Sequence, residues 1–505
     1  MLKKEDIEKY GECSKIIKYF QEIDKIPRNS GNEGAVVEYL KNFAIQRGLE
    51  FLTDKHNNII IKKNSTNGKN TYLAFQSHTD MVCEKIPGST HDFSNDPVDL
   101  HITGDYIESG ETTIGADNGI GVAFMLSLLD SDNIEHPNLE MIFTSEEETS
   151  MNGAKSIDFS SLKSNRIISL DAFSEDTIIC GCASNYAKYL SLSKKRTQTP
   201  DNTELNSYKI NVSGFKGGHS GKEIGDNRGN PIIILGKILA ILNLHKNVYL
   251  NSIDGGTWVT AIPRNAECIV TTKILDFDKL TQMFKKIEAK LKKQYNCKDI
   301  SISIESVDTP NKAFDIDTSC DIIKYIANFP DKPILRDRIT DDVLLSANLG
   351  TIWLEDDTLF LENSIRSNIQ QEHTELLKKK LDNIEESMDI HPISIFDFPG
   401  YIRESDSEFL DFLYKQYIET FGKKPKLKEE HILLECAFFA DKINNLEYVS
   451  ISPDILNPHS PNEKVSISSI QRMWEYVKDV VKGIDKNITK NASINSLVCE
   501  DDKSR

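Results

Sequence analysis

Apolar residues recur at helical spacing in two segments near the start of the chain. IIKYFQEIDKI (residues 16–26) and AVVEYLKNFAIQ (35–46) each place apolar side chains three or four positions apart. The second segment is followed by Gly48, which suits the left-handed conformation that often closes a helix. The pattern therefore predicts two helices at the start of the chain.

Four short apolar runs of strand length follow these helices. They are NIIIKK (58–63), YLAFQSH (72–78), LEMIF (139–143) and RIISL (166–170). Between the second and third runs, ADNGIGVAFMLSLL (116–129) begins among glycines and continues as an apolar segment of helical length. Apolar strands that alternate with helices predict an α/β fold with a mostly parallel central sheet flanked by helices.

The pattern changes between about residues 186 and 396. Strand-like segments such as YKINVSGF and ISISIES alternate apolar and polar residues, and amphipathic helices are predicted at 277–295 and 373–388. Because the order strand, helix, strand occurs twice, we interpret 186–396 as an inserted α+β lid domain with an internal duplication.

The first pattern returns after Pro399. It predicts a helix at 408–422, an apolar strand at 447–452 and a closing helix at 470–484. We therefore expect a single domain formed by residues 1–185 and 397–485. Residues 486–505 carry few side chains that could pack, and we expect them to form a mobile tail.

Composition narrows the range of partners. The chain has 505 residues and a formal net charge of -18, which argues against nucleic acids and anionic membranes as partners. Its nine cysteines show no paired CxxC pattern, so we expect free thiols in a reducing compartment, with Cys180 and Cys182 in the core. No signal-peptide pattern or long apolar run occurs, and we predict a cytoplasmic protein.

Polar residues gather where the predicted strands end. They are His78, Asp80, Asp117, Glu146–Glu148, Asp171 and His459. Ligands of open α/β sheets bind at the carboxyl ends of the strands, so these side chains are expected to converge on one edge. Taken singly, each has a structural explanation, such as a helix cap, a turn residue or a solvated charge. Taken together, they predict a metal site.

Imidazole and carboxylate groups without a thiolate suit zinc, with manganese or cobalt as alternatives. The carboxylates are too many for one ion. Two ions about 3.5–4 Å apart can share a bridging carboxylate and activate a water molecule for hydrolysis. The residues alone therefore favour a two-metal hydrolase.

Nine segments resemble, in order, the motifs of one known family. They are QSHTDMV, TTIGADNGIG, SEEETSMNGA, SLDAFSED, FKGGHSG, GGTWVTAIPRNA, LENSIRS, HILLECA and NPHSPNEKV. The family is that of the aminoacyl-histidine dipeptidases, also called cytosol nonspecific dipeptidases or peptidase D, in the superfamily of co-catalytic zinc aminopeptidases, carboxypeptidases and aminoacylases. The resemblance spans residues 14–484. It implies a metallopeptidase that hydrolyses dipeptides with a free N-terminus, Xaa-His dipeptides among them.

The resemblance also implies a metal-ligand set. Asp117 would bridge two zinc ions, His78 and Asp171 would hold one of them, and Glu148 and His459 would hold the other.

Further residues gain roles from the same motifs. Asp80 would orient the ring of His78, as such ligands generally require. Aligning MNGA (151–154) with the family motif makes Glu147 the general base and leaves Glu146 as an extra neighbour that can turn to solvent.

Substrate contacts are implied in the inserted region. His219 would stabilise the oxyanion, and Arg366 would receive the terminal carboxylate of the substrate. A tight glycine turn around His219 and a surface charge at Arg366 are the structural alternatives. Thr260 and Glu435 are further candidates for substrate binding.

The chain departs from the family pattern around the expected cleft. Thr260 replaces an asparagine, and residues other than glycine stand at Leu433, Ala437, Ser452 and Asn457. The five ligands and the base are retained, so the chemistry is expected to persist while the shape of the cleft changes.

Two other functions stay open at this point. One is an amide hydrolase of the same superfamily, such as an aminoacylase or another peptidase, and the other is a non-catalytic binding protein on the same fold. A homodimer is also left open, because family lids often mediate dimers.

Overall fold

Two structural units are formed from interleaved parts of the chain. The computed structural model describes residues 2–202, 204–244, 247–273, 277–330, 332–369, 371–403 and 406–487. The first unit comprises Met1–Gly181, Arg403–Glu429 and Glu435–Arg505, and the second comprises Cys182–Ile402 and Glu430–Leu434. The predicted tail lies outside the described residues from residue 488 onward.

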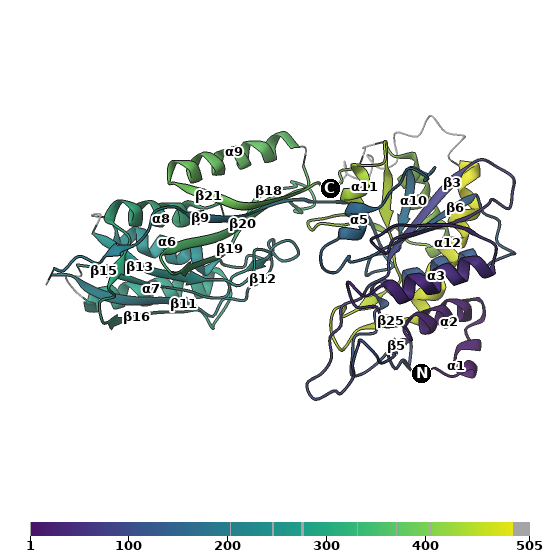
Figure 1. Ribbon diagram of the computed structural model, residues 1–505, viewed down its shortest axis with the longest axis horizontal. Helices are drawn as coiled ribbons and strands as arrows, with labels where there is room; N and C mark the ends of the chain where they lie inside the picture. The colour runs from purple at the N-terminus through teal and green to yellow at the C-terminus, as the bar shows by residue number, and fades with distance from the viewer. Residues whose placement is uncertain are drawn as a thin grey trace. The chain divides into compact units, whose positions relative to one another are not determined.

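The first unit is built on an eight-stranded sheet with the order β1-β2-β6-β3-β7-β23-β8-β22. Figure 1 labels the neighbouring strands β3 and β6 of this sheet. The strands are β1 (Glu50–Thr53), β2 (Ile59–Lys63), β3 (Tyr72–His78), β6 (Asn138–Thr144), β7 (Arg166–Ser169), β8 (Thr177–Cys182), β22 (Lys426–Glu430) and β23 (Glu447–Ser450). Strands β6, β3, β7 and β23 pair in parallel, whereas β1 with β2, β2 with β6, and β23 with β8 pair antiparallel. The predicted α/β class with a mostly parallel central sheet is confirmed, and the antiparallel edges are additional.

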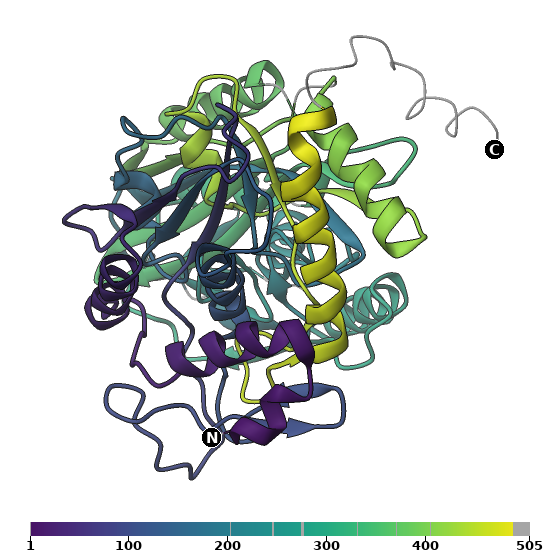
Figure 2. The same cartoon turned by 90° about the vertical axis from the view of Figure 1, so that its right-hand side faces the viewer.

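Helices cover this sheet. They are α1 (Lys4–Glu8), η1 (Gly11–Cys13), α2 (Ser14–Ile23), α3 (Gly34–Gln46), α4 (Ala116–Leu129), α5 (Asn152–Ser156), α10 (Glu408–Phe421), α11 (Cys436–Ala440) and α12 (Ile467–Asn487). Every residue of α4 is buried, because this helix is apolar all round and packs between β3 and α2. The long helix α12 packs against α10 (Figure 2).

A small antiparallel sheet completes the first unit. It has the order β24-β25-β5-β4, with β4 (His101–Thr103), β5 (Tyr106–Glu108), β24 (Ile455–Leu456) and β25 (Lys464–Ser466). Strands β24 and β25 are joined by residues 457–463, so this sheet anchors both ends of the segment that carries His459.

The second unit contains a nine-stranded sheet with the main order β16-β11-β15-β13-β19-β20-β9-β21 and β18 paired to β19. The strands are β9 (Ser184–Leu192), β11 (Asn206–Ser213), β13 (Val248–Gly255), β15 (Ala266–Thr272), β16 (Ser301–Val307), β18 (Lys332–Arg336), β19 (Val343–Glu355), β20 (Thr358–Ser367) and β21 (Ile390–Phe398). Along the main order, four strands lie on each side of the β13–β19 junction, where Gly255 pairs with Ile352, and β18 adds a fifth strand on the β19 side.

The helices of the second unit are α6 (Pro231–Leu242), α7 (Phe277–Gln294), α8 (Ile316–Asn328) and α9 (Gln371–Ser387). Short pairs are formed by β10 (Thr197–Gln198) with β17 (Lys312–Ala313) and by β12 (Gly218–His219) with β14 (Ala261–Ile262). Helices α6 and α8 pack on one another, and α9 lies along β21.

A buried charge pair ties α9 to the sheet. Lys188 of β9 is 2% exposed and contacts Glu385 of α9. The other carboxylate oxygen of Glu385 accepts hydrogen bonds from Tyr325 Oη (2.9 Å) and Asn363 Nδ2 (3.2 Å). A buried ion pair is tolerated when further hydrogen bonds satisfy its remaining atoms, and this network meets that condition.

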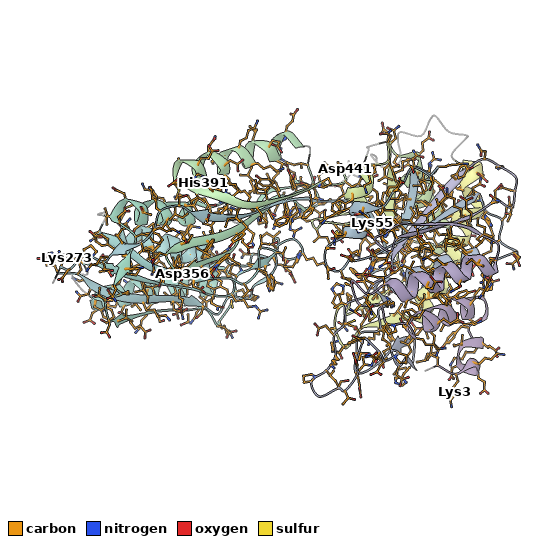
Figure 3. The ribbon with its side chains drawn as sticks, in the orientation of Figure 1. Lys3, Lys55, Lys273, Asp356, His391 and Asp441 are labelled. Carbon is orange, nitrogen blue, oxygen red and sulfur yellow. The ribbon has the colours of Figure 1, made fainter. Side chains whose placement is uncertain are left out.

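Polar side chains such as Lys55, Lys273, Asp356, His391 and Asp441 are exposed on the surface (Figure 3). Cys180 and Cys182 are buried, as expected. Among the described residues, no helix is both long enough and apolar enough to cross a membrane.

Candidate metal centre

The predicted ligands lie where neighbouring strands of the first sheet end. His78 closes β3 and pairs in register with Thr144, which closes β6 and leads into the glutamates. Strand β7 runs parallel to β3 on its other side, and Asp171 follows two residues after its end. Because these strands are parallel, their carboxyl ends bring the side chains to one edge of the sheet.

Asp117 occupies the centre of the group. Its Oδ1 lies 3.1 Å from His78 Nε2, and its Oδ2 lies 2.9 Å from His459 Nε2. His459 Nε2 also lies 3.0 Å from Glu148 Oε1, and His78 Nε2 lies 4.0 Å from Asp171 Oδ1. One carboxylate thus presents each of its oxygens to a different histidine, which is the arrangement that a bridging ligand requires.

Ligand atoms of His78, Asp117 and Glu148 lie within 4.8 Å of one another. Imidazole nitrogens and carboxylate oxygens at such separations suit a divalent ion of the zinc type. The donor set therefore fits a metal ion.

Asp80 joins the ligands to the glutamate loop. Its Oδ1 accepts the backbone N–H of Glu147 (3.1 Å), and its Oδ2 accepts that of Glu148 (3.2 Å) and the hydroxyl of Ser30 (2.7 Å). Oδ1 also lies 3.3 Å from His78 Nδ1, whose other neighbour is the carbonyl oxygen of Asp80 at 3.1 Å. An Nδ1–H facing these oxygens leaves Nε2 of His78 free for a metal.

The electrostatics of the centre also favour a cation. Burial raises the pKa of Glu147 well above its usual value, and the neighbouring carboxylates raise it further. Burial and the carboxylates of Asp117 and Glu148 raise the pKa of Asp171 to about 7. Burial and Asp117 also raise the pKa of Glu148. The positive charge near these carboxylates is too small to keep their pKa values in the usual range, and a divalent ion would supply the missing charge.

Glu146 differs from the expectation that it turns to solvent. It is only partly exposed, and its Oε2 accepts hydrogen bonds from Ser150 Oγ (2.6 Å) and Asn152 Nδ2 (3.0 Å). Its backbone is left-handed, with φ +53°. Glu146 therefore closes the local turn, while Glu147 and Glu148 are tied through their backbones to Asp80.

Two buried residues that support the centre were missed by the sequence analysis. Glu463, in NPHSPNE, accepts the backbone N–H groups of Ile114 (2.8 Å), Gly115 (2.9 Å) and Asp117 (3.2 Å). It thereby fixes the loop that leads into Asp117. The only sequence signal is its position four residues after His459, within the last motif.

Arg28 is the second of these residues. Its guanidinium pairs with Asp24 (2.8 Å) and donates to the carbonyl oxygens of Thr79 (3.3 Å), Asp80 (3.2 Å) and Gly115 (2.8 Å). It joins the segments that carry His78 and Asp117. Its hydrogen bonds to these two segments are made to backbone carbonyl oxygens, so residue type alone could not reveal this role.

Glu435 lies in the first unit and is buried beside the metal centre. Its Oε2 accepts hydrogen bonds from Gln76 Nε2 (2.5 Å) and Thr144 Oγ1 (2.9 Å). Burial, with Asp171 nearby, raises its pKa to about 8. Its Oε1 is buried without a hydrogen-bond partner among the described residues.

The other predicted substrate residues lie in the second unit. His219 Nδ1 accepts the backbone N–H groups of Gly221 (3.0 Å) and Lys222 (3.2 Å), so the ring keeps its proton on Nε2. Burial and the nearby charge of Arg366 lower the pKa of His219 to about 4, and the ring is neutral at pH 7. Thr260 lies next to it, since the carbonyl oxygen of Thr260 accepts the N–H of Ser220 at 2.8 Å.

Arg366 is 4% exposed, which excludes the surface-charge alternative. Burial lowers the pKa of its guanidinium to about 10, so it stays charged at pH 7. Among the described residues, its side chain has no hydrogen-bond or carboxylate partner. A buried, unpaired cation favours an anionic ligand.

At the positions where the family pattern has glycine, the larger residues of this chain fit their local surroundings. Ala437 is fully buried in α11, and the hydroxyl of Ser452 donates to the carbonyl oxygen of Pro453 at 2.8 Å. Asn457 has φ +53°, a conformation that asparagine tolerates better than most residues. Leu433 is partly exposed.

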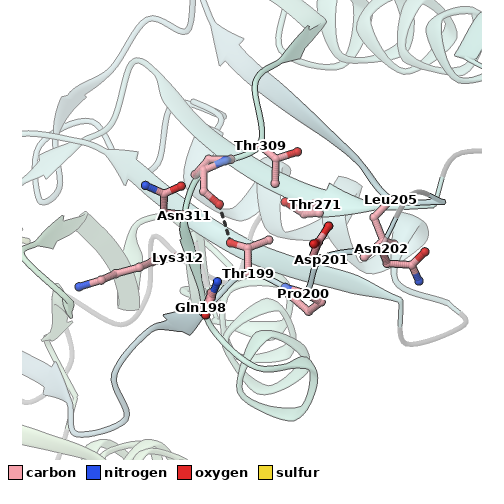
Figure 4. A pocket seen from close by; sticks show the side chains of 11 residues that line it. Gln198, Thr199, Pro200, Asp201, Asn202, Leu205, Thr271, Thr309, Asn311 and Lys312 are labelled. Carbon is pink, nitrogen blue, oxygen red and sulfur yellow. Dashed lines mark hydrogen bonds between the residues drawn. The ribbon is translucent and has the colours of Figure 1, made fainter.

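A separate cavity of ≈ 410 Å³ lies in the second unit (Figure 4). Thr199 on its wall donates a hydrogen bond to the carbonyl oxygen of Pro310 at 2.6 Å. The lining contains neither histidine nor cysteine, and Asp201 is its single carboxylate. This set cannot form a metal site like that of the first unit, and we assign it no catalytic role.

Comparisons with known proteins agree with this architecture. Residues 204–297 match the model of a peptidase dimerisation domain. A protein of Escherichia coli strain K12 called cytosol non-specific dipeptidase is 29% identical over 470 residues, covering 92% of this chain and 96% of that protein.

Solved structures extend the comparison. The aminoacylhistidine dipeptidase of Vibrio alginolyticus superposes with a TM-score of 0.84 at 29% identity, covering 93% of this chain and 96% of that chain. A tripeptidase of Staphylococcus aureus, with a TM-score of 0.54 at 16% identity, shares the fold. The resemblance inferred from the nine motifs is confirmed along nearly the whole chain.

Proposed function

We propose that this protein, which resembles the aminoacyl-histidine dipeptidases over nearly its whole length, hydrolyses dipeptides with a free N-terminus and depends on metal ions. It is a metallopeptidase. The relatives from Escherichia coli and Vibrio alginolyticus, both called dipeptidases, support this reading. The structural observation that carries it is the placement of the two oxygens of Asp117 against two different histidines.

The proposed ligands divide into two sets that share Asp117. His78 and Asp171 would hold one ion, and Glu148 and His459 would hold the other. When bound, two zinc ions, or manganese or cobalt in their place, would supply Lewis acidity and lower the pKa of a water molecule. Asp80 is assigned to orient His78, on the evidence of the contacts at its Nδ1.

Glu147 is proposed to be the general base. It is not among the proposed ligands, so its carboxylate is available to take a proton from water and then deliver it to the leaving amine. Its backbone N–H is held by Asp80, so the position of the base is linked to the position of His78. This coupling would keep the proton acceptor in place during turnover.

His219 and Arg366 are proposed to bind the reacting carbonyl and the far end of the substrate. The neutral ring of His219 can donate only from Nε2, which suits stabilisation of an oxyanion. The guanidinium of Arg366, which has no carboxylate partner among the described residues, suits a C-terminal carboxylate. Thr260 and Glu435 are proposed as further contacts. Thr260 adjoins His219, and Glu435 has a buried oxygen without a hydrogen-bond partner among the described residues.

We also propose roles for the larger parts of the chain. Residues 1–185 and 397–485 would be the catalytic domain, and 186–396 the lid. The match of residues 204–297 to a peptidase dimerisation domain supports a homodimer. The cytosolic relative supports a cytoplasmic location.

A paired substrate panel tests the function. Gly-His, β-Ala-His, Ala-Ala and Leu-Leu would be assayed beside their N-acetylated forms with purified protein. We expect cleavage of the free dipeptides and at least ~10-fold slower cleavage of the acetylated forms, because acetylation removes the charge of the amine. Faster cleavage of the acetylated compounds would instead indicate an aminoacylase-like amide hydrolase.

A further inference from the structure

Arg366 has a neighbour on each side in the sheet of the second unit. It pairs in register with Ser346 of β19 and with Asn185 of β9, and both pairings are antiparallel. Residues directly opposite one another in antiparallel strands point to the same face, with Cβ atoms about 4.5–5.5 Å apart. Ser346, Arg366 and Asn185 therefore form a row across three strands.

The Ser346 side of this row is closed by a neutral network. Asn368 Nδ2 donates to the carbonyl oxygen of Glu430 (2.9 Å), which directs Asn368 Oδ1 to His431 Nδ1 (2.5 Å). His431 therefore carries its proton on Nδ1 and accepts the hydroxyl of Ser346 on Nε2 (2.8 Å). Burial and Arg366 lower the pKa of His431 to about 3, so the ring is neutral, and among the described residues no charge on this side offsets the guanidinium.

The Asn185 side is different, because three of its buried polar atoms have no hydrogen-bond partner among the described residues. Asn185 is 6% exposed, and its Oδ1 is buried without a hydrogen bond to any described residue. The same holds for Nε of Arg366 and for Oγ of Ser364, which lies two residues before Arg366 on the same face. Buried polar groups are rarely left unpaired, so an incomplete set around a buried cation indicates a missing anionic ligand.

We propose that Asn185 is a specificity-determining residue that binds the C-terminal carboxylate of the substrate together with Arg366. This assignment rests on the proposed dipeptidase function, which supplies a ligand with a terminal carboxylate. The guanidinium can donate two parallel hydrogen bonds to the carboxylate, and the amide of Asn185 donates to a remaining lone pair. The orientation of that amide is set by the ligand, since no described residue fixes it.

The uncharged state of Asn185 matters for selectivity. An aspartate at this position would face Arg366 directly and neutralise it within the chain, which removes the attraction for an external carboxylate. Asparagine keeps the charge available while still offering a hydrogen-bond donor. The pair would thus select substrates that end in a free carboxylate over C-terminal amides.

The test compares two hydrolysis-resistant ligands. They are the reduced dipeptide Ala-ψ(CH2NH)-Leu and its C-terminal amide, and their binding to the metal-loaded protein would be measured by calorimetry. We expect wild type to prefer the carboxylate form by ~10–100-fold, the range for a hydrogen-bonded charge. Asn185→Asp should reduce this preference to within ~3-fold, and Asn185→Ala should reduce it partially.

Asn206→Asp is the matched control, because it adds the same charge at an exposed position of β11 in the same sheet. It should keep the wild-type preference. The proposal is overturned if Asn185→Asp also keeps that preference, or if wild type shows none. Folding of each variant is checked by circular dichroism, and Asn185→Ala serves if Asn185→Asp does not fold.

Hydrolysis of Ala-Leu by wild type is measured in parallel. Selective binding of the carboxylate form without hydrolysis would refute the dipeptidase function and leave the role of Asn185 intact. Hydrolysis of Ala-Leu combined with an unchanged preference in Asn185→Asp would support the dipeptidase function and refute the role of Asn185.

Discussion

Replacing Glu147 with glutamine is expected to lower kcat by about 10²–10⁴-fold, the range for removal of a general base. Glutamine has nearly the same shape and keeps the backbone hydrogen bond to Asp80, but it cannot accept and deliver a proton at neutral pH. Metal content should stay at the wild-type value, because Glu147 is not among the proposed ligands. Steady-state kinetics on Ala-Ala and elemental analysis of the same sample check both expectations.

The neighbouring glutamate provides the control. Glu146→Gln removes a carboxylate from the same loop, but that side chain bonds only Ser150 and Asn152 in the described structure. Its kcat should stay within a few-fold of wild type. Near-normal turnover in Glu147→Gln, or a comparable loss in Glu146→Gln, would mean that the base has been misassigned.

Replacing Asp117 with asparagine is expected to remove both metal ions and to lower activity by more than ~10²-fold. Loss of a residue that merely supports a ligand already costs 10–100-fold in metal affinity or activity, so loss of the shared ligand should cost more. The amide also turns an N–H₂ donor toward one of the two histidines that the carboxylate oxygens now face. Bound metal per chain would be measured after dialysis against metal-free buffer.

Comparing Glu148→Ala with Asp117→Asn distinguishes a ligand of one ion from a ligand that two ions share. Glu148 Oε1 lies 3.0 Å from His459 Nε2, and Glu148 is proposed as a ligand of one ion only, so this variant should retain about one ion per chain. If Asp117→Asn and Glu148→Ala lose the same amount of metal, Asp117 does not bridge. If Glu148→Ala keeps two ions, the roles of Glu147 and Glu148 are reversed.

The arrangement of the metal centre could be predicted because its side chains follow the ends of parallel strands. The strand pattern alone places His78, the run Glu146–Glu148 and Asp171, since parallel strands end at the same edge of a sheet, whereas the choice of Glu148 as the ligand came from the family resemblance. The supporting residues could not be predicted in the same way. Arg28 and Glu463 form hydrogen bonds with backbone atoms of distant loops. Every residue type has these backbone atoms, so the sequence does not reveal such contacts.

The second unit was harder to predict. Helix α6, PIIILGKILAIL, is a nearly continuous apolar run that periodicity cannot distinguish from a buried strand. Its helical start was nonetheless encoded, because Asn230 caps the N–H groups of Ile232 and Ile233 and Pro231 occupies the first turn. The row formed by Ser346, Arg366 and Asn185 depends on strand register, which only the folded sheet reveals.

Metal-dependent turnover tests the central claim most directly. Hydrolysis of Gly-His and Ala-Ala would be measured with the protein as purified, after removal of metal by a chelator, and after titration with zinc. We predict that chelation abolishes cleavage of both dipeptides and that activity returns as zinc approaches two ions per chain. Cleavage that persists in fully metal-free protein would contradict the account, as would its absence in protein that holds two ions per chain.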